Sequence, residues 1–143
     1  MRPLGVTLIS YYQILRGALG VLFGLSLMLF TSLAAKLASL AAEGNALGNI
    51  LHSLGRWAGL GIVVFGLLHI LAGSGLLKME NWGRLLALLL SAIGLVMLLP
   101  VLIATHGLPL IFAVINAASI FYLALPPVKR TFHGEKPALR AAA

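Results

Sequence analysis

Residues 57–77 read WAGLGIVVFGLLHILAGSGLL, a stretch that contains no Lys, Arg, Asp or Glu. As an α-helix this stretch is about 30 Å long at 1.5 Å per residue, which matches the hydrocarbon core of a bilayer. Arg56 and Lys78 stand directly at its two ends. Backbone polar groups find no water in lipid, so they must bond to one another within a helix. The stretch therefore predicts a membrane-spanning helix.

The rest of the chain repeats this apolar character. Of 143 residues, 61% are hydrophobic and 9% are charged, whereas soluble domains are about 25% charged. We expect an all-α protein with a single transmembrane domain over residues 1–143, built as a four-transmembrane-helix bundle. Its helices are expected at residues 4–35, 57–77, 82–104 and 108–125. Pro126 and Pro127 should end the fourth helix, and residues 128–143 read as a basic tail.

Residues 36–55 separate the first two apolar runs and carry the polar group Glu43, Gly44 and Asn45. This composition predicts a loop that contains a short amphipathic segment.

The Lys and Arg residues are distributed unequally between the two ends of the expected helices. Cytoplasmic loops hold the excess of these residues. One side would hold Lys36 and Arg56, and the other would hold Arg2, Lys78, Arg84, Lys129, Arg130, Lys136 and Arg140. We therefore expect a multi-pass membrane protein with both termini in the cytoplasm.

Four polar residues fall near the middle of the expected spans, about 15 Å from the cytoplasmic ends. They are Gln13, His69, Ser91 and Asn116. One interpretation is a polar layer whose hydrogen bonds, at about 0.6 kcal/mol each, hold the helices together. The other is a binding site, with His69 as an axial ligand of a haem or chlorophyll-type pigment, or as part of a proton relay with Gln13 and Arg16.

Arg16 is the candidate functional charge of the first helix. If that helix enters lipid at Leu4, the guanidinium lies about 18 Å deep and costs about 2.5–3.5 kcal/mol. If the span instead covers residues 17–35, Arg16 lies at the interface and Gln13 leaves the polar layer. A further alternative is a small transporter or channel, a homo-oligomer in which Arg16, Gln13 and Asn116 line a path.

Small residues recur at four-residue spacing, which lets helix backbones approach closely. Those that we expect at helix contacts are Gly20, Gly24, Gly55, Gly59, Gly83, Ala87, Ser91, Ala113 and Ala117.

Several functional classes are disfavoured. The chain has no cysteine, which excludes thiolate metal sites, disulfides and covalent c-type haem attachment. We find no carboxylate pair, metal-ligand spacing or phosphate loop, so we expect no catalytic residue, no metal site and no enzyme. The net charge of +7 lies at helix ends and in the tail, which favours lipid headgroups over nucleic acid. Lys129, Arg130, Lys136 and Arg140 are expected to dock lipid or an acidic partner.

Three short motifs mark the membrane boundaries: Arg2-Pro3-Leu4-Gly5-Val6-Thr7, Gly75-Leu76-Leu77-Lys78 with Trp82-Gly83-Arg84, and Tyr122-Leu123 with Pro127-Val128-Lys129-Arg130-Thr131-Phe132. In these motifs the chain resembles a group of small bacterial four-span membrane proteins without an assigned activity. The resemblance implies the topology and a location in the bacterial inner membrane, and it carries over no catalytic residue. Our leading expectation is a non-enzymatic accessory or structural subunit, without a cofactor, whose partners are the bilayer and other membrane subunits or further copies of itself.

Overall fold

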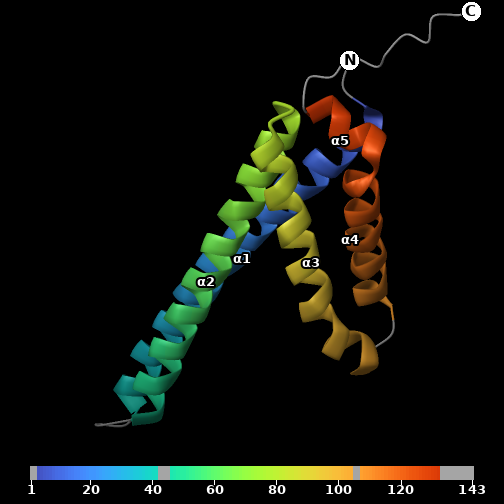
Figure 1. Cartoon of the computed structure of the whole chain (residues 1–143). Helices are drawn as coiled ribbons and strands as arrows, with labels where there is room; N and C mark the ends of the chain where they lie inside the picture. Colours follow the sequence, from blue (N-terminus) through green and yellow to red (C-terminus); the bar gives the residue numbers. More distant parts are fainter. Residues whose placement is uncertain (1–2, 42–45, 105–106, 133–143) are drawn as a thin grey trace, which may run out of the picture. The chain divides into compact units, whose positions relative to one another are not determined.

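The computed structural model describes residues 3–41, 46–104 and 107–132, and the regular structure in these ranges is entirely helical. The helices are α1 (Leu4–Ala41), α2 (Ala46–Leu77), α3 (Asn81–Ala104), α4 (Leu108–Ala124) and α5 (Pro126–Phe132) (Figure 1). The all-α class is therefore confirmed for the described part of the chain.

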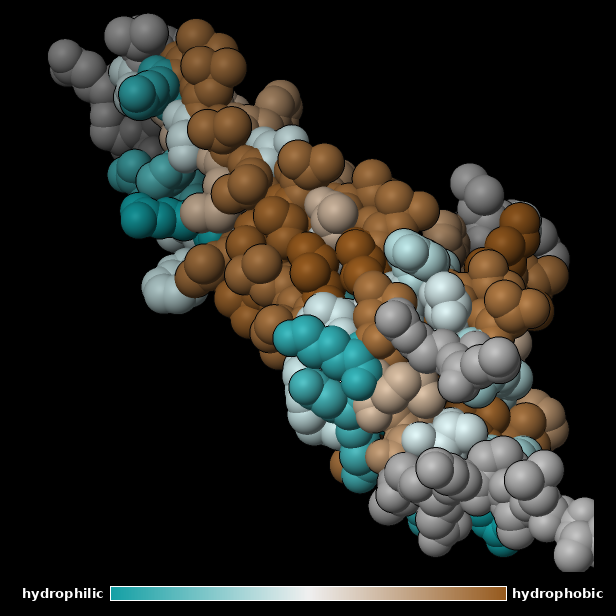
Figure 2. Space-filling view, turned by 90° about the horizontal axis from the view of Figure 1, so that it is seen from above, coloured by the Kyte–Doolittle hydropathy of each residue, from teal (hydrophilic) through white to brown (hydrophobic). Residues whose placement is uncertain are grey.

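Three of these helices, α1, α2 and α3, are long and apolar enough to cross a membrane. With 17 residues, α4 is about 25 Å long and falls short of a hydrocarbon core of about 30 Å. It is bent by 69° from α5, and the two helices together pass the same test as one broken span. Exposed apolar side chains cover a wide area of the surface, while hydrophilic residues gather in a few groups (Figure 2). These features are consistent with a multi-pass membrane protein.

The expected loop over residues 36–55 is wrong for most of its length. The first helix continues to Ala41 and the second begins at Ala46, while residues 42–45 lie outside the described part. Lys36 and Arg56 mark a change in polarity, but Ala, Leu, Lys and Ser tolerate the helical backbone on either side of such a change. The change in polarity therefore does not mark the end of a helix.

The third and fourth helices agree with the expected ranges to within one residue at each end. The fourth ends before Pro126, as expected, but the first part of the expected tail is the helix α5. Proline is well suited to the first turn of a helix, where its missing N–H would have no partner. The two prolines thus end one helix and begin the next.

The chain divides into two compact units. Unit 2 comprises Leu15–Ile70, and unit 1 comprises Met1–Ile14 together with Leu71–Ala143. Both boundaries fall inside helices, one within α1 and one within α2.

Unit 2 is an antiparallel hairpin of α1 and α2, closed by glycine contacts. A Cβ atom added at Gly17 would lie 2.5 Å from the carbonyl oxygen of Gly66, and one added at Gly24 would lie 2.7 Å from that of Gly59. These contacts recur every seventh residue, or two helical turns, in opposite directions along the two helices. The expected packing roles of Gly24 and Gly59 are confirmed, and Gly17 and Gly66 extend the same row.

Unit 1 packs one face of each of its helices inward. On α1 this face includes Val6 and Gln13, and on α3 it includes Ala87 and Leu90. The α4 face follows the same three- to four-residue spacing and comprises Ala113, Asn116, Ser119 and Leu123. Ala117, which we expected at a helix contact, is exposed, because at about 100° around α4 from Asn116 it lies beyond the edge of this inward face.

The connection between α2 and α3 is a tight turn. Met79 adopts a left-handed backbone conformation with φ of 59°. The Glu80 amide donates to the carbonyl oxygen of Gly75 at 3.0 Å, and the Met79 amide donates to that of Leu76 at 3.0 Å. This is the Schellman arrangement that ends a helix. It brings α3 so close that a Cβ at Gly83 would lie 2.6 Å from the Gly75 Cα.

Candidate functional site

Gln13 and Ser91 form the polar contact between α1 and α3 in unit 1. The Gln13 side chain is fully buried, and its Nε2 atom donates to Ser91 Oγ at 3.2 Å. Its Oε1 atom has no hydrogen-bond partner among the described residues. Because the amide is buried away from water, the bond to Ser91 partly offsets the cost of its desolvation. Gln13 is thus joined to Ser91, another member of the expected polar layer.

Polar side chains of α4 lie in the same unit. Asn116 is fully buried, and Ser119 is buried with its hydroxyl donating to the Ile115 carbonyl oxygen at 2.8 Å. Ser10 behaves like Ser119, because its hydroxyl donates to the Val6 carbonyl oxygen at 2.6 Å. These two serines are satisfied by their own helices, so they add polarity to the interior without demanding a partner from another helix.

His69 belongs to unit 2, whereas the other three members of the expected polar layer belong to unit 1. Only 2% of His69 is exposed, and neither ring nitrogen has a hydrogen-bond partner among the described residues. The Phe65 ring lies one turn away on the same face of α2, with its centroid 4.8 Å from that of the imidazole. The imidazole therefore combines an aromatic contact with two buried nitrogens that have no hydrogen-bond partner among the described residues.

Arg84 is a buried charge. From the sequence, we had counted it only among the Lys and Arg residues expected on the cytoplasmic side. Its exposed fraction is 6%, and its Nη1 atom donates to the Leu123 carbonyl oxygen at 3.3 Å. Its Nε atom donates to Asn81 Oδ1 at 3.1 Å. Leu123 lies in the last turn of α4, where carbonyl oxygens lack helical partners and carry a partial negative charge. Arg84 thus joins the start of α3 to the end of α4.

Two sequence signals could have indicated this role. Asn81 precedes Arg84 by three residues, one helical turn, and Pro126 places the end of α4 near the same membrane boundary as the start of α3.

The remaining candidate cations differ in their surroundings. Arg16 lies in unit 2 and is half-buried on α1. On α5, Lys129 and Arg130 are exposed, while Val128 and Phe132 are buried on the opposite side of this short amphipathic helix. Lys136 and Arg140 lie outside the described residues.

Two pockets lie within single units. A largely apolar pocket of about 460 Å³ lies between the first turns of α1 and the last turns of α4, with Tyr12 and Tyr122 among its lining residues. A pocket of about 370 Å³ lies on the hairpin of unit 2. Sequence reasoning missed the second pocket, although His52 and Arg56 stand one helical turn apart on one side of α2 and Trp57 directly follows Arg56.

In the described part of the chain, no group of three or more His, Asp and Glu residues could hold a metal ion. No protein-family model, curated protein or solved structure matches this chain.

Proposed function

We propose that this chain is a non-enzymatic accessory subunit of a larger membrane assembly, and that the end of the α1–α2 hairpin is its docking element. The observation that carries the proposal is the excess length of the two helices. The stretch of α2 from Arg56 to Leu77 already fills a hydrocarbon core of about 30 Å. Residues 46–55 of α2 therefore extend about 15 Å further.

The extension is apolar on its exposed surface. Past the level of Arg56, at least half of each of the side chains Leu33, Leu37, Ile50, Leu51 and Leu54 is exposed. Covering one such side chain contributes about 1.5–3 kcal/mol. Contiguous apolar surface outside the hydrocarbon core is typical of a protein–protein contact. The partner is another membrane subunit or a second copy of this chain.

Native extraction tests this proposal. The chain, solubilised from its own membranes in mild detergent, should copurify with a partner at a fixed ratio, or as a defined oligomer. The double variant Leu51→Ala, Leu54→Ala should lose the partner. The matched variant Leu19→Ala, Leu22→Ala, which changes exposed side chains in the lipid-facing part of α1, should retain it. A wild-type chain that extracts as a lone monomer would contradict the proposal.

We also propose four spans in a bacterial inner membrane with both ends in the cytoplasm, the α4–α5 pair forming the last span. The excess of Lys and Arg near Lys78 and α5 supports this orientation. Because the chain has no cysteine, a single introduced cysteine reports its own location. In intact cells, an impermeant maleimide should label Ser39→Cys and leave Lys78→Cys unlabelled. The reverse pattern would invert the topology.

A second candidate function is supported by the imidazole of His69, which is buried without a hydrogen-bond partner among the described residues. In a cofactor-binding or electron-transfer subunit, this imidazole would supply an axial ligand to a haem or a pigment. The purified chain should then show a Soret or pigment band that His69→Ala removes and His52→Ala retains. A spectrum without such a band would eliminate this function.

A further inference from the structure

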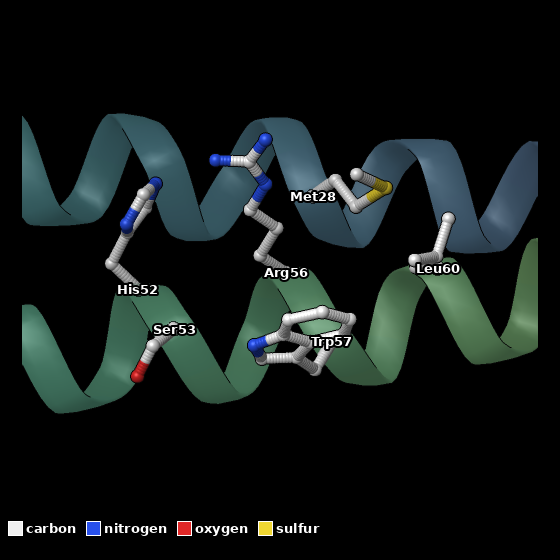
Figure 3. Close-up of a pocket in the computed structure, with 6 residues that line it drawn as sticks. All are labelled: Met28, His52, Ser53, Arg56, Trp57 and Leu60. Atoms are coloured by element: carbon white, nitrogen blue, oxygen red, sulfur yellow. The ribbon is translucent and has the colours of Figure 1, made fainter.

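The pocket on the hairpin of unit 2 has a polar and an apolar end. It is lined by Met28 of α1 and by five residues of α2: His52, Ser53, Arg56, Trp57 and Leu60. In Figure 3 the imidazole of His52 and the guanidinium of Arg56 both extend from α2 toward α1, one helical turn apart. Met28 and Leu60 lie beyond them along the hairpin (Figure 3). The polar residues thus lie toward one end of the pocket and the apolar residues toward the other, as the headgroup and acyl chains do in a phospholipid.

The pocket lies at the level where a lipid headgroup meets its acyl chains. Arg56 directly precedes the uncharged stretch of residues 57–77, whose helical length of about 30 Å equals the hydrocarbon thickness. Trp57 is 73% exposed, and an exposed indole is typical of the membrane–water interface. The polar end of the pocket therefore lies on the headgroup side of this boundary, and Leu60 and Met28 lie on the acyl-chain side.

Arg56 is the charge that this pocket offers to a ligand. Within residues 3–41, 46–104 and 107–132, its guanidinium takes part in no hydrogen bond or ion pair. The Ser53 hydroxyl is already committed, because it donates to the Ile50 carbonyl oxygen at 3.0 Å. A guanidinium presents a planar fork of N–H donors that matches two oxygens of a phosphate.

His52 contributes polarity beside this charge. Its Nε2 atom lies 3.4 Å from Ser32 Oγ, whose own hydroxyl proton is donated to the Met28 carbonyl oxygen at 2.7 Å. The serine oxygen is therefore the acceptor and Nε2–H the donor, which leaves Nδ1 as the second nitrogen of the ring. Arg56 remains the principal anchor for a negative group.

We propose that this pocket is a binding site for an anionic phospholipid, whose phosphate pairs with Arg56 and whose first acyl segment lies against Trp57, Leu60 and Met28. A free phosphate would satisfy the guanidinium but would leave the apolar half of the pocket uncovered. The lipid covers both halves. The proposal is independent of the partner subunit described above, because the pocket is built from residues of one hairpin.

Measurement of lipid selectivity by electron paramagnetic resonance tests this proposed binding site. The full chain is reconstituted in phosphatidylcholine vesicles with spin-labelled phosphatidylglycerol or spin-labelled phosphatidylcholine, and the fraction of label held at the protein is compared. Wild type should hold phosphatidylglycerol preferentially. Arg56→Gln should lower this preference about tenfold, the loss expected when a hydrogen bond to a charged group is removed. Arg56→Lys, which keeps the charge without the fork, should lower it less.

Lys36→Gln is the matched control, because Lys36 is an exposed cation of the same hairpin outside the pocket. It should leave the preference unchanged. If Arg56→Gln and Lys36→Gln lowered the preference for phosphatidylglycerol equally, the preference would arise from general surface charge and not from the pocket, which would overturn the proposal. Loss of the wild-type preference on addition of inorganic phosphate would identify a free-anion site and overturn it as well. Circular dichroism of each variant confirms that the helices are retained.

Discussion

The hairpin of unit 2 and the interior of unit 1 join their helices by different means. In the hairpin, Gly17 and Gly66 bring two backbones into direct contact. In unit 1, Gln13 bonds to Ser91, and Arg84 bonds to the end of α4. Lipid offers no hydrophobic force between helices, so association depends on close packing or on hydrogen bonds. Unit 1 combines these hydrogen bonds with a close backbone contact of its own, between Gly75 and Gly83, so one short chain uses both solutions.

The largest effect is expected in the hairpin. A Cβ at Gly66 would lie 2.7 Å from the Gly17 carbonyl oxygen, so Gly66→Leu must separate two backbones. We expect a loss of about 3 kcal/mol in the free energy of unfolding, measured by titration with dodecyl sulfate in mixed micelles. At Gly61 an added Cβ would meet nothing within 4 Å. Gly61→Leu should therefore be neutral or slightly stabilising. If Gly66→Leu and Gly61→Leu unfolded at the same midpoint, glycine contacts would not be what stabilises the hairpin.

The buried arginine of unit 1 should give the next largest effect. Arg84→Met leaves the Leu123 carbonyl oxygen and Asn81 Oδ1 without this donor. Hydrogen bonds to charged groups contribute about 1.5–3 kcal/mol, so we expect a loss of about 2 kcal/mol in the same titration. Lys78→Met, at an exposed cation of the same unit, provides the control. If Arg84→Met lowered the free energy of unfolding no more than Lys78→Met does, the bond from Arg84 to the end of α4 would not stabilise unit 1.

The smallest effect is expected for the uncharged polar pair. In a double-mutant cycle of Gln13→Leu and Ser91→Ala, the coupling should be about 0.6 kcal/mol and at most about 1.7 kcal/mol. The same cycle with Ser119→Ala should show no coupling, because that hydroxyl bonds within α4. Coupling of equal size in both cycles would mean that Gln13 and Ser91 do not interact specifically.

The polar residues show where sequence reasoning succeeded and where it could not. Burial of Gln13, Ser91 and Asn116 followed from their depth in apolar runs, since a polar group in lipid must turn toward protein. The bond between Gln13 and Ser91 required knowledge of which helices are neighbours. The capping role of Arg84 was hidden for the same reason, because its partners, apart from Asn81, are backbone atoms 39 positions away in the sequence.

The helix ends of α1 and α2 illustrate a second limit. We expected the first helix to end before Lys36 and the second to begin after Arg56, because charges indicate where an apolar span ends. Both helices continue past these charges. Helix propensity differs by only a few tenths of a kcal/mol among Ala, Leu, Lys and Ser, so the sequence contained no strong stop there. Proline is different, because it removes an N–H and clashes with the preceding turn. Pro126 accordingly marked the end of α4 correctly.

The sequence by itself determined that this chain is helical and apolar enough to enter a membrane, because a lipid solvent forces backbone hydrogen bonds to close within each segment. It also indicated Gly24 and Gly59 as contact residues, but it did not indicate Gly17 and Gly66. Only the tertiary structure decided that Gly17 meets Gly66, that Arg84 reaches the end of α4, and that His52, Arg56 and Trp57 border one pocket. Those outcomes depend on the rotation and partner of each helix, which an almost uniformly apolar surface leaves unspecified.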